Sequence, residues 1–294
     1  MIIRPNLFPE GRTRAITFSY DDAPKYDREL IAIFNNYGMK GTFHANSMHI
    51  GENRNFTDDE ARELYKGHEL SVHTLSHPCL YNLPDEELHD EIMLDKKRLE
   101  EICGYTVRGM SYPYGQFDDK IIANAKRCGM KYSRTTMSTN DFKIPEDFLK
   151  WHPTCHHNAD LDTLMAKFME TRMLRVYNMP LFYIWGHSYE FDPDHNDNLY
   201  KMEDFCKKNK NIDGVWYATN IEIYDYVTAM RNIEISAENP SFRHSAVSAQ
   251  HIYASLFCRI AVFAETAQRF GKSRCTTLPE TVVNSERHNG NSLP

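Results

Sequence analysis

The sequence has no pair of cysteines in a CxxC pattern, although it contains seven cysteines among 294 residues. Scattered single cysteines are not typical of a zinc ribbon or a disulfide-stapled secreted domain, and they favour a reducing compartment. Long apolar runs are also missing, since no stretch approaches the roughly 20 residues that a membrane helix needs. The first residues lack the charged-then-apolar layout of a secretory signal. We therefore expect a cytoplasmic protein that does not enter a membrane.

An excess of basic residues is missing as well. The chain has 34 Lys and Arg against 41 Asp and Glu, which gives a formal net charge of -7. Nucleic-acid binding needs clustered positive charge, so this balance argues against a general DNA or RNA binder. The hydrophobic share of 41% and the charged share of 26% are those of an ordinary globular protein. At this length one large core can form.

Short apolar runs alternate with helical patterns along most of the chain. Seven runs predict strands: 15–20, 41–46, 69–74, 107–112, 131–136, 181–187 and 215–220. After the first run, Leu30, Ile31 and Phe34 recur at helical spacing, and later Thr57 and Glu60 form the signature of a capping box. Repeated strand–helix units imply a parallel sheet with right-handed crossovers. Seven such units favour a closed or nearly closed α/β barrel over an open sheet.

The composition changes near residue 240. From 241 to 294 the chain has no aspartate, and six Lys and Arg face three Glu. An amphipathic helix is predicted within 251–271, whereas the last residues have the composition of a disordered segment. We expect two parts: a catalytic barrel at 1–240, and a partly disordered tail at 241–294 that is not native to the fold.

Polar residues of unusual type stand where the predicted strands end. Asp21 and Asp22 follow the first run, His73 lies in the third, Tyr114 follows the fourth and His187 ends the sixth. The loops at the carboxyl ends of barrel strands converge on one mouth, so these side chains should become neighbours.

Each of these pieces has a structural alternative. In "HTLSH", His73 and His77 are four residues apart, which would place both imidazoles on one side of a helical turn and allow them to chelate a divalent ion. Such a short motif can equally consist of structural histidines. Asp21 and Asp22 can cap the next helix, or they can need a cation to relieve their repulsion. Taken without the other motifs, His187 would be interpreted as a histidine of the hydrophobic core.

Four ordered motifs together resemble the polysaccharide deacetylase family, also called the NodB-homology domain or carbohydrate esterase family four. They are "SYDDA" (19–23), "HTLSH" (73–77), "SYPYG" (111–115) and "WGH" (185–187). The resemblance covers roughly residues 13–230 and implies a single-domain, distorted (β/α)7 barrel. It also implies that Asp22, His73 and His77 bind a divalent metal. This donor set suits Zn²⁺, with Co²⁺ or Ni²⁺ as alternatives.

The same resemblance implies catalytic roles. Asp21 would be the general base that takes a proton from the attacking water, and His187 the general acid that protonates the leaving group. The backbone N–H of Tyr114, after Pro113, would hold the oxyanion.

The sequence departs from the family pattern at two motifs. Ser111 stands where the family has an arginine that orients the base, and Arg134 is our candidate to supply a guanidinium instead, the alternative being an exposed rim charge. The fourth motif, an Asp with a Trp, is not evident.

Other residues near these motifs are candidates for supporting roles. Trp151 could provide a wall of the site, His156 or His157 a polar rim, and Trp185 further support. Glu190 and Asp192 are expected to cap a loop.

Three functions follow from this pattern. The leading one is hydrolysis of N- or O-linked acetyl groups on a carbohydrate, with a metal and an acetylated saccharide as partners. The alternative is hydrolysis of non-peptide C–N bonds in small cyclic amides on the same scaffold. A barrel that binds metal or carbohydrate without catalysis is the third, and the retained base Asp21 argues against it. The oligomeric state is left open.

Overall fold

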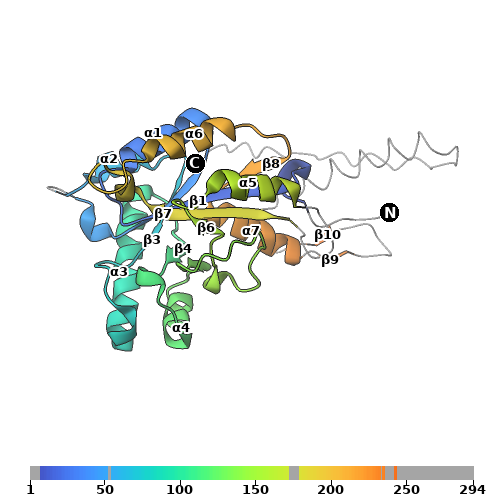
Figure 1. Cartoon of the computed structure of the whole chain (residues 1–294). Helices are drawn as coiled ribbons and strands as arrows, with labels where there is room; N and C mark the ends of the chain where they lie inside the picture. Colours follow the sequence, from blue (N-terminus) through green and yellow to red (C-terminus); the bar gives the residue numbers. More distant parts are fainter. Residues whose placement is uncertain (1–6, 52–53, 172–178, 233, 236–241, 244–294) are drawn as a thin grey trace, which may run out of the picture.

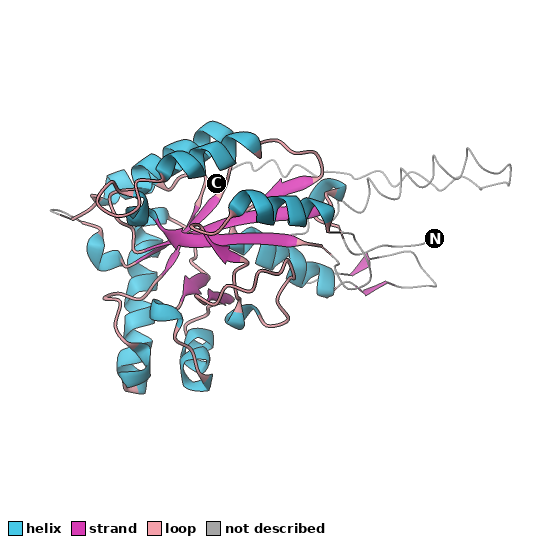
Figure 2. Ribbon diagram, viewed as in Figure 1, coloured by secondary structure: helices cyan, strands magenta, loops and turns pink. Residues whose placement is uncertain are grey.

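The computed structural model describes residues 7–51, 54–171, 179–232, 234–235 and 242–243. Eight strands form one parallel sheet, at the centre of the molecule in Figure 2. They are β1 (Arg14–Asp21), β2 (Gly41–Ala45), β3 (Glu69–Val72), β4 (Gly109–Ser111), β5 (Tyr132–Arg134), β6 (Cys155–His156), β7 (Leu181–His187) and β8 (Val215–Tyr217). All seven predicted strands are present. The two residues of β6 are too few to give a periodic signal.

The sheet curls into the distorted (β/α) barrel that the motifs predict. Its strand order is β5-β4-β3-β2-β1-β7-β6, and β8 adds to β1. The segment between β5 and β6 connects the two strands that stand at the ends of this order. At its start the N–H of Trp151 donates to Ser133, and at its end the N–H of His157 donates to Trp185. The prediction of the fold class is therefore confirmed.

Helices cover the outside of the barrel. They are α1 (Asp27–Tyr37), α2 (Asp58–Leu64), α3 (Asp85–Cys103), α4 (Asp119–Arg127), α5 (Leu161–Glu170), α6 (Leu199–Lys208) and α7 (Asn220–Arg231). Helices α1 and α6 pack together on one side, and α3 and α4 on the other (Figure 1). The predicted capping box is present at α2, where Thr57 and Glu60 bond reciprocally. No helix in the described ranges combines the length and the apolar character needed to cross a membrane.

Short 3-10 turns lie mostly in the loops of the barrel. They are η1 (Pro9–Gly11), η2 (Ser47–His49), η3 (Leu80–Asn82), η4 (Pro113–Gly115), η5 (Phe148–Lys150) and η6 (Ser188–Phe191). A small antiparallel pair, β9 (Glu234–Ile235) and β10 (Phe242–Arg243), follows α7. The rest of the predicted tail, including its helix within 251–271, lies outside the described residues, so the domain division remains a prediction.

Aromatic side chains pack between helices and strands, whereas the inside of the barrel is partly polar. Phe18, Phe34 and Phe43 are buried in the outer layer. Inside, Glu69 accepts hydrogen bonds from Thr42 at 3.0 Å and from Tyr132 at 2.7 Å. Burial raises the pKa of Glu69 to about 7, against the opposing effect of these bonds. The parallel strands are thus fixed in register by hydrogen bonds inside the barrel as well as by apolar packing outside it.

Candidate active site

The carboxyl ends of β1, β3 and β7 meet at one mouth, as parallel strands in a barrel require. Asp21 ends β1, and its register partner on β7 is His187. The Nε2 atom of His73 lies 3.4 Å from Oδ1 of Asp22, and Nε2 of His77 lies 3.8 Å from the same oxygen. The structure therefore brings together residues that are up to 166 positions apart in the sequence, taking 187 minus 21.

The two histidines reach this place through a loop, so the expected helical turn is wrong. Residues 73–78 contain no helix, and Thr74 and His77 have φ values of 65° and 57°. Asp22 has a φ of 77°, and α1 begins only at Asp27, so Asp22 does not cap that helix. Non-glycine residues rarely adopt positive φ, and such strain concentrates at functional sites. The backbone is bent here to aim three ligand groups at one point.

The atoms of this cluster fit a cation. The carbonyl of Ser111 lies 3.0 Å from Nδ1 of His73 and can only accept, so Nδ1 carries the proton and Nε2 keeps its lone pair. Burial lowers the pKa of His73, which favours this neutral ring. Nε2 of His73 and Oδ1 of Asp22 are both buried without a hydrogen-bond partner in the described part of the chain. Two facing acceptors need a positive charge between them, and Asp22, His73 and His77 are close enough to share a metal ion.

Asp21 lies next to this cluster and is almost completely buried. The guanidinium of Arg134 pairs with its Oδ2, and the Ser111 hydroxyl donates to its Oδ1 at 3.1 Å. Burial is the largest single effect and alone would raise the pKa of Asp21, but the charges of Arg134, His73, His44 and His187 together outweigh burial and hold that pKa well below its usual range. Arg134 is itself fully buried, so the alternative of an exposed rim charge is wrong.

Ser111 stands where the family has an arginine, and its hydroxyl still takes part in the site. Its hydroxyl bonds to Asp21 and also lies 2.7 Å from Nδ1 of His73, so one small side chain orients both the carboxylate and a metal-ligand candidate. Arg134 approaches Asp21 from β5, and its guanidinium lies over the ring of Trp185, 4.5 Å from the ring centroid. The support for Asp21 is thus divided between two residues.

A carboxylate that the sequence predicted only as a loop cap holds His187. Nδ1 of His187 donates to Oε1 of Glu190 at 2.7 Å, while its Nε2 faces Oδ2 of Asp22 at 4.0 Å. Oε2 of Glu190 lies 3.2 Å from Nε2 of His156 and 3.1 Å from Nε2 of His157. Glu190 therefore does not cap the loop as expected, although Asp192 does, accepting the N–H of Asp194. Its spacing of three residues from His187, within one turn of η6, was the available signal.

The electrostatics of this pair favour a charged imidazole. Burial lowers the pKa of His187, but the hydrogen bond to Glu190 and the charges of Asp21 and Asp22 outweigh burial and raise it. Burial raises the pKa of Glu190, and its bonds to the three histidines reverse this and hold that pKa well below its usual range. The pair is thus a partly buried carboxylate facing a readily protonated ring.

Tyr114 lies beside His77, in the turn η4. Its φ is 56°, and its N–H donates to no acceptor in the described ranges, so this N–H is available to a ligand. Pro113 before it is buried. The ring of Tyr114 is 63% exposed and packs edge-on against His77, with the ring centroids 4.6 Å apart.

Two tryptophans that we expected near the site lie at different depths. Trp151 is only 1% exposed and packs against Tyr132 and Tyr183 in the core, so the prediction that it forms a wall of the site is wrong. Its backbone pairs with β5 at Arg134, which places the ring in the core. Trp185 lies beneath the site, between Arg134 and the ring of His156.

Asp95 on α3 positions the loops that carry the ligands, and no motif indicated it. Its carboxylate accepts the backbone N–H of His73 at 3.0 Å and that of Ser47 at 2.7 Å. Burial raises the pKa of Asp95 to about 7, with these bonds acting in the opposite direction. Because the contacts are to backbone, only the folded structure reveals them.

Comparison with known proteins agrees with this geometry. The chain is 23% identical over 146 residues to a chitooligosaccharide deacetylase of a Bradyrhizobium species, covering 49% of this chain and 65% of that one. It is 31% identical over 136 residues to chitin deacetylase 1 of Cryptococcus neoformans, covering 46% of this chain and 28% of that one. The matches thus span less than two thirds of these relatives.

Solved structures show the same fold. A protein of Mycobacterium smegmatis assigned to the polysaccharide deacetylases matches with a TM-score of 0.57 at 15% identity, over 80% of this chain and 96% of that one. The Xyl-CE4 domain of a xylanase from the hindgut metagenome of Trinervitermes trinervoides matches with a TM-score of 0.50 at 15% identity, over 72% and 90% of the two chains. Residues 9–133, which carry the first three motifs and make up less than half of the chain, match the family model described as polysaccharide deacetylase.

Proposed function

We propose that this protein is a divalent-metal-dependent hydrolase that removes acetyl groups from a carbohydrate. The observation that carries the proposal is the pair of facing, unpartnered acceptors on His73 and Asp22, with a buried carboxylate on one side and His187 on the other. A site that only bound metal would have no need of a separate carboxylate held by a buried arginine.

Asp22, His73 and His77 are the residues that would hold the ion. Two imidazoles and one carboxylate form a donor set that suits Zn²⁺, and Co²⁺ or Ni²⁺ can occupy the same set. An ion in such a site supplies Lewis acidity, which lowers the pKa of water and polarises a carbonyl oxygen.

Asp21 would accept the proton of the attacking water. Arg134, together with the neighbouring histidines, keeps this carboxylate ionised, so the acceptor is present throughout the neutral range. The low pKa also makes Asp21 a weak base, which is why the water must be acidified for the transfer to succeed. Ser111 and Arg134 would fix the carboxylate in one orientation from two directions.

His187 would return a proton to the leaving nitrogen or oxygen. Glu190 holds Nδ1, so that Nε2 faces the mouth, and it raises the pKa of the ring toward the charged form. The free N–H of Tyr114 would hold the oxygen of the acetyl group as it gains negative charge. Acid and base thus lie on separate sides of the proposed metal ligands.

The proposal is tested by acetate release from a panel of substrates. Purified protein, stripped with a chelator and resupplied with Zn²⁺, Co²⁺ or Ni²⁺, is assayed on N-acetylglucosamine oligomers, acetylated xylo-oligomers and a cyclic imide. We expect acetate from at least one saccharide, only with metal present. Ring opening of the imide without acetate release from any saccharide would replace this proposal by the cyclic-amide alternative.

Metal content should distinguish the two histidine clusters. A second group, His156, His157 and Glu190, is also close enough to hold an ion, but both carboxylate oxygens of Glu190 already accept hydrogen bonds, Oε1 from His187 and Oε2 from Asn158. We therefore expect about one ion per chain, lost in His77→Ala, because a structural or catalytic zinc needs at least three protein ligands. His156→Ala is the matched control and should keep its ion when measured by mass spectrometry of the metal. Retention of the ion in His77→Ala would contradict the ligand assignment.

The pair of His187 and Glu190 predicts a change in pH dependence. In Glu190→Gln the carboxylate charge that raises the pKa of His187 is lost, so the imidazole loses its proton at a lower pH. A general acid must be protonated to act, so the alkaline limb of the profile of kcat/KM against pH should move to lower pH. Asp192→Asn, a change in the same loop away from His187, should leave the limb in place. An unmoved limb in Glu190→Gln would show that Glu190 does not tune the acid.

A further inference from the structure

Asp27 is a buried carboxylate that the proposed mechanism does not use. It is the first residue of α1, is only 1% exposed, and accepts hydrogen bonds from the hydroxyl groups of Ser188 at 2.5 Å and Tyr65 at 2.8 Å. Tyr65 caps the end of α2, and Ser188 is the first residue of η6. One side chain thus joins three segments: the start of α1, the end of α2 and the turn after β7.

The position of Ser188 connects this carboxylate to the proposed acid. Ser188 directly follows His187 and precedes Glu190, whose Oε1 holds Nδ1 of His187 at 2.7 Å. Asp27 ends the loop that begins with the metal-ligand candidate Asp22. The bond between Ser188 and Asp27 therefore fixes the turn of the acid against this loop. Across the same two segments, Nε2 of His187 faces Oδ2 of Asp22 at 4.0 Å.

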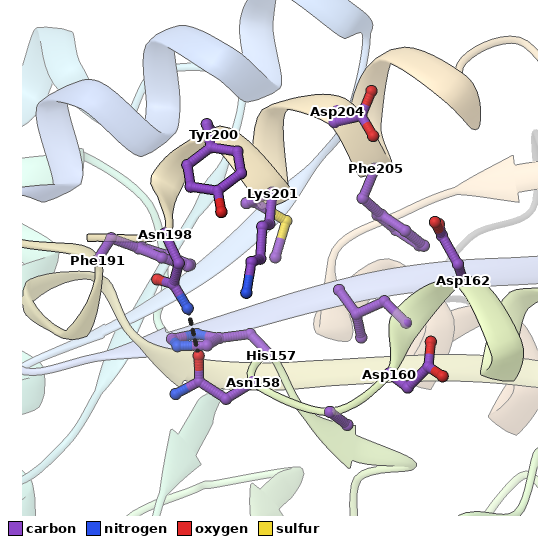
Figure 3. A pocket seen from close by; sticks show the side chains of 13 residues that line it. His157, Asn158, Asp160, Asp162, Phe191, Asn198, Tyr200, Lys201, Asp204 and Phe205 are labelled. Atoms are coloured by element: carbon purple, nitrogen blue, oxygen red, sulfur yellow. Dashed lines mark hydrogen bonds between the residues drawn. The ribbon is translucent and has the colours of Figure 1, made fainter. Parts of the chain in front are cut away.

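A second link to the same turn is open to solvent. Asn158 donates to Oε2 of Glu190 at 3.1 Å, and Asn198 donates to Asn158 at 2.9 Å. Both amides line a cavity of about 470 Å³ (Figure 3). Water that enters the cavity can replace either bond, whereas the bond between Ser188 and Asp27 is closed to solvent, so its loss leaves a buried acceptor without that partner. The buried bond is therefore the stronger constraint on the turn.

The burial of Asp27 is costly, and α1 alone does not account for it. Burial raises the pKa of Asp27 to about 7, against the opposing effect of the two hydroxyl groups. An aspartate in the first turn of a helix interacts favourably with the helix dipole even when it is exposed. In the described part of the chain, the side-chain hydrogen bonds of Asp27 go to other segments and not to α1. The buried carboxylate thus serves the contacts between segments.

We propose that Asp27 is a positioning residue that holds His187 in place for proton transfer by binding Ser188. The inference rests on the proposed function and deepens it, because it names the group that keeps the proposed acid at a fixed distance from the proposed metal ligands. Asp27 is too deeply buried to touch a substrate, so its effect reaches the reaction only through the place of His187. Loss of the link should therefore lower kcat and leave KM unchanged.

The test removes one hydroxyl group at a time in the metal-loaded full chain. The assay is acetate release from the most active saccharide of the panel. In Ser188→Ala we expect kcat to fall about tenfold or more, because a small displacement of a positioned group is enough for such a loss. Tyr65→Phe is the matched control, since it removes the other bond to the same carboxylate from a residue at the end of α2, and it should keep the kcat of wild type.

A double-mutant cycle shows whether Ser188 acts through Asp27. Asp27→Ala should lower kcat at least as much as Ser188→Ala does. Adding Ser188→Ala to Asp27→Ala should then cause little further loss, because the shared bond is already absent. Losses that simply multiply would overturn the inference. Melting temperatures show which variants are folded, and if Asp27→Ala does not fold, the comparison of Ser188→Ala with Tyr65→Phe decides.

Hydrogen exchange separates this inference from the proposed function, because it needs no activity. The amides of η6 should exchange about five- to tenfold faster in Ser188→Ala than in wild type, the factor expected for one lost hydrogen bond, and should not change in Tyr65→Phe. If no saccharide releases acetate, faster exchange confined to Ser188→Ala still supports the link while the proposed function has failed. Unchanged exchange of η6 in Ser188→Ala, an equal fall of kcat in Tyr65→Phe, or a loss carried by KM alone each overturn the inference.

Discussion

Asp21→Asn should lower kcat by about two to four orders of magnitude, the range that a positioned general base contributes. The amide has nearly the same shape, but it cannot accept a proton from water. The metal should remain bound, because Asp22, His73 and His77 are unchanged. The assay is acetate release on the best substrate of the panel, with metal content measured on the same sample.

Asp22→Asn is the matched control for this prediction. It changes the adjacent carboxylate, whose Oδ1 faces His73 at 3.4 Å, and should lose the ion as well as the activity. The two variants thus separate a base from a ligand by metal content alone. Full turnover in Asp21→Asn, or loss of the ion from it, would show that Asp21 does not have the role we propose.

Arg134→Ala should have the second large effect, on stability as well as on pH dependence. The substitution leaves the buried carboxylate of Asp21 without its cation, and removing one partner of a buried pair costs about 3–5 kcal/mol. Without the guanidinium, burial raises the pKa of Asp21, so the base is protonated at a higher pH than in wild type. The acidic limb of the profile of kcat/KM against pH should therefore move to higher pH. Urea unfolding and the pH profile measure the two effects.

Arg108→Ala provides the comparison. Arg108 also makes an ion pair with two hydrogen bonds, to Asp225 at 2.7 and 2.8 Å, but that pair is partly exposed and does not involve the carboxylate of Asp21. Arg108→Ala should therefore destabilise the protein less than Arg134→Ala does, and it should leave the acidic limb of the pH profile unchanged. If Arg134→Ala kept full turnover and the wild-type profile, Arg134 would not substitute for the family arginine.

Most of the barrel could be predicted because its strands and helices repeat a local pattern. Runs such as 181–187 are apolar over their whole length, which a strand buried on both faces requires. The short β6 escaped detection because its strand character comes from its neighbours: Trp151 pairs with β5, and His156 with β7. Pairing that depends on tertiary contacts leaves no period in the sequence.

The candidate site could be predicted only as a set of residue types. Motif order indicated Asp21, Asp22, His73, His77 and His187, and the barrel brings them together. The geometry of the histidine loop could not be derived, because its positive φ values are imposed by the fold. The hydrogen-bond partners of these residues could not be predicted, because Arg134 and Asp95 lie on other elements. Glu190 was expected to cap a loop, but it binds His187.

Gly186 has a further consequence, which concerns how the family varies. A Cβ atom at this position would lie 2.0 Å from Nδ1 of His157, so any larger residue would expel the imidazole from beneath Glu190. The glycine of "WGH" and the second histidine of "CHHN" are therefore coupled, and they should be inherited or lost together. In related chains that keep this pair, the acid should be held by a glutamate three residues later.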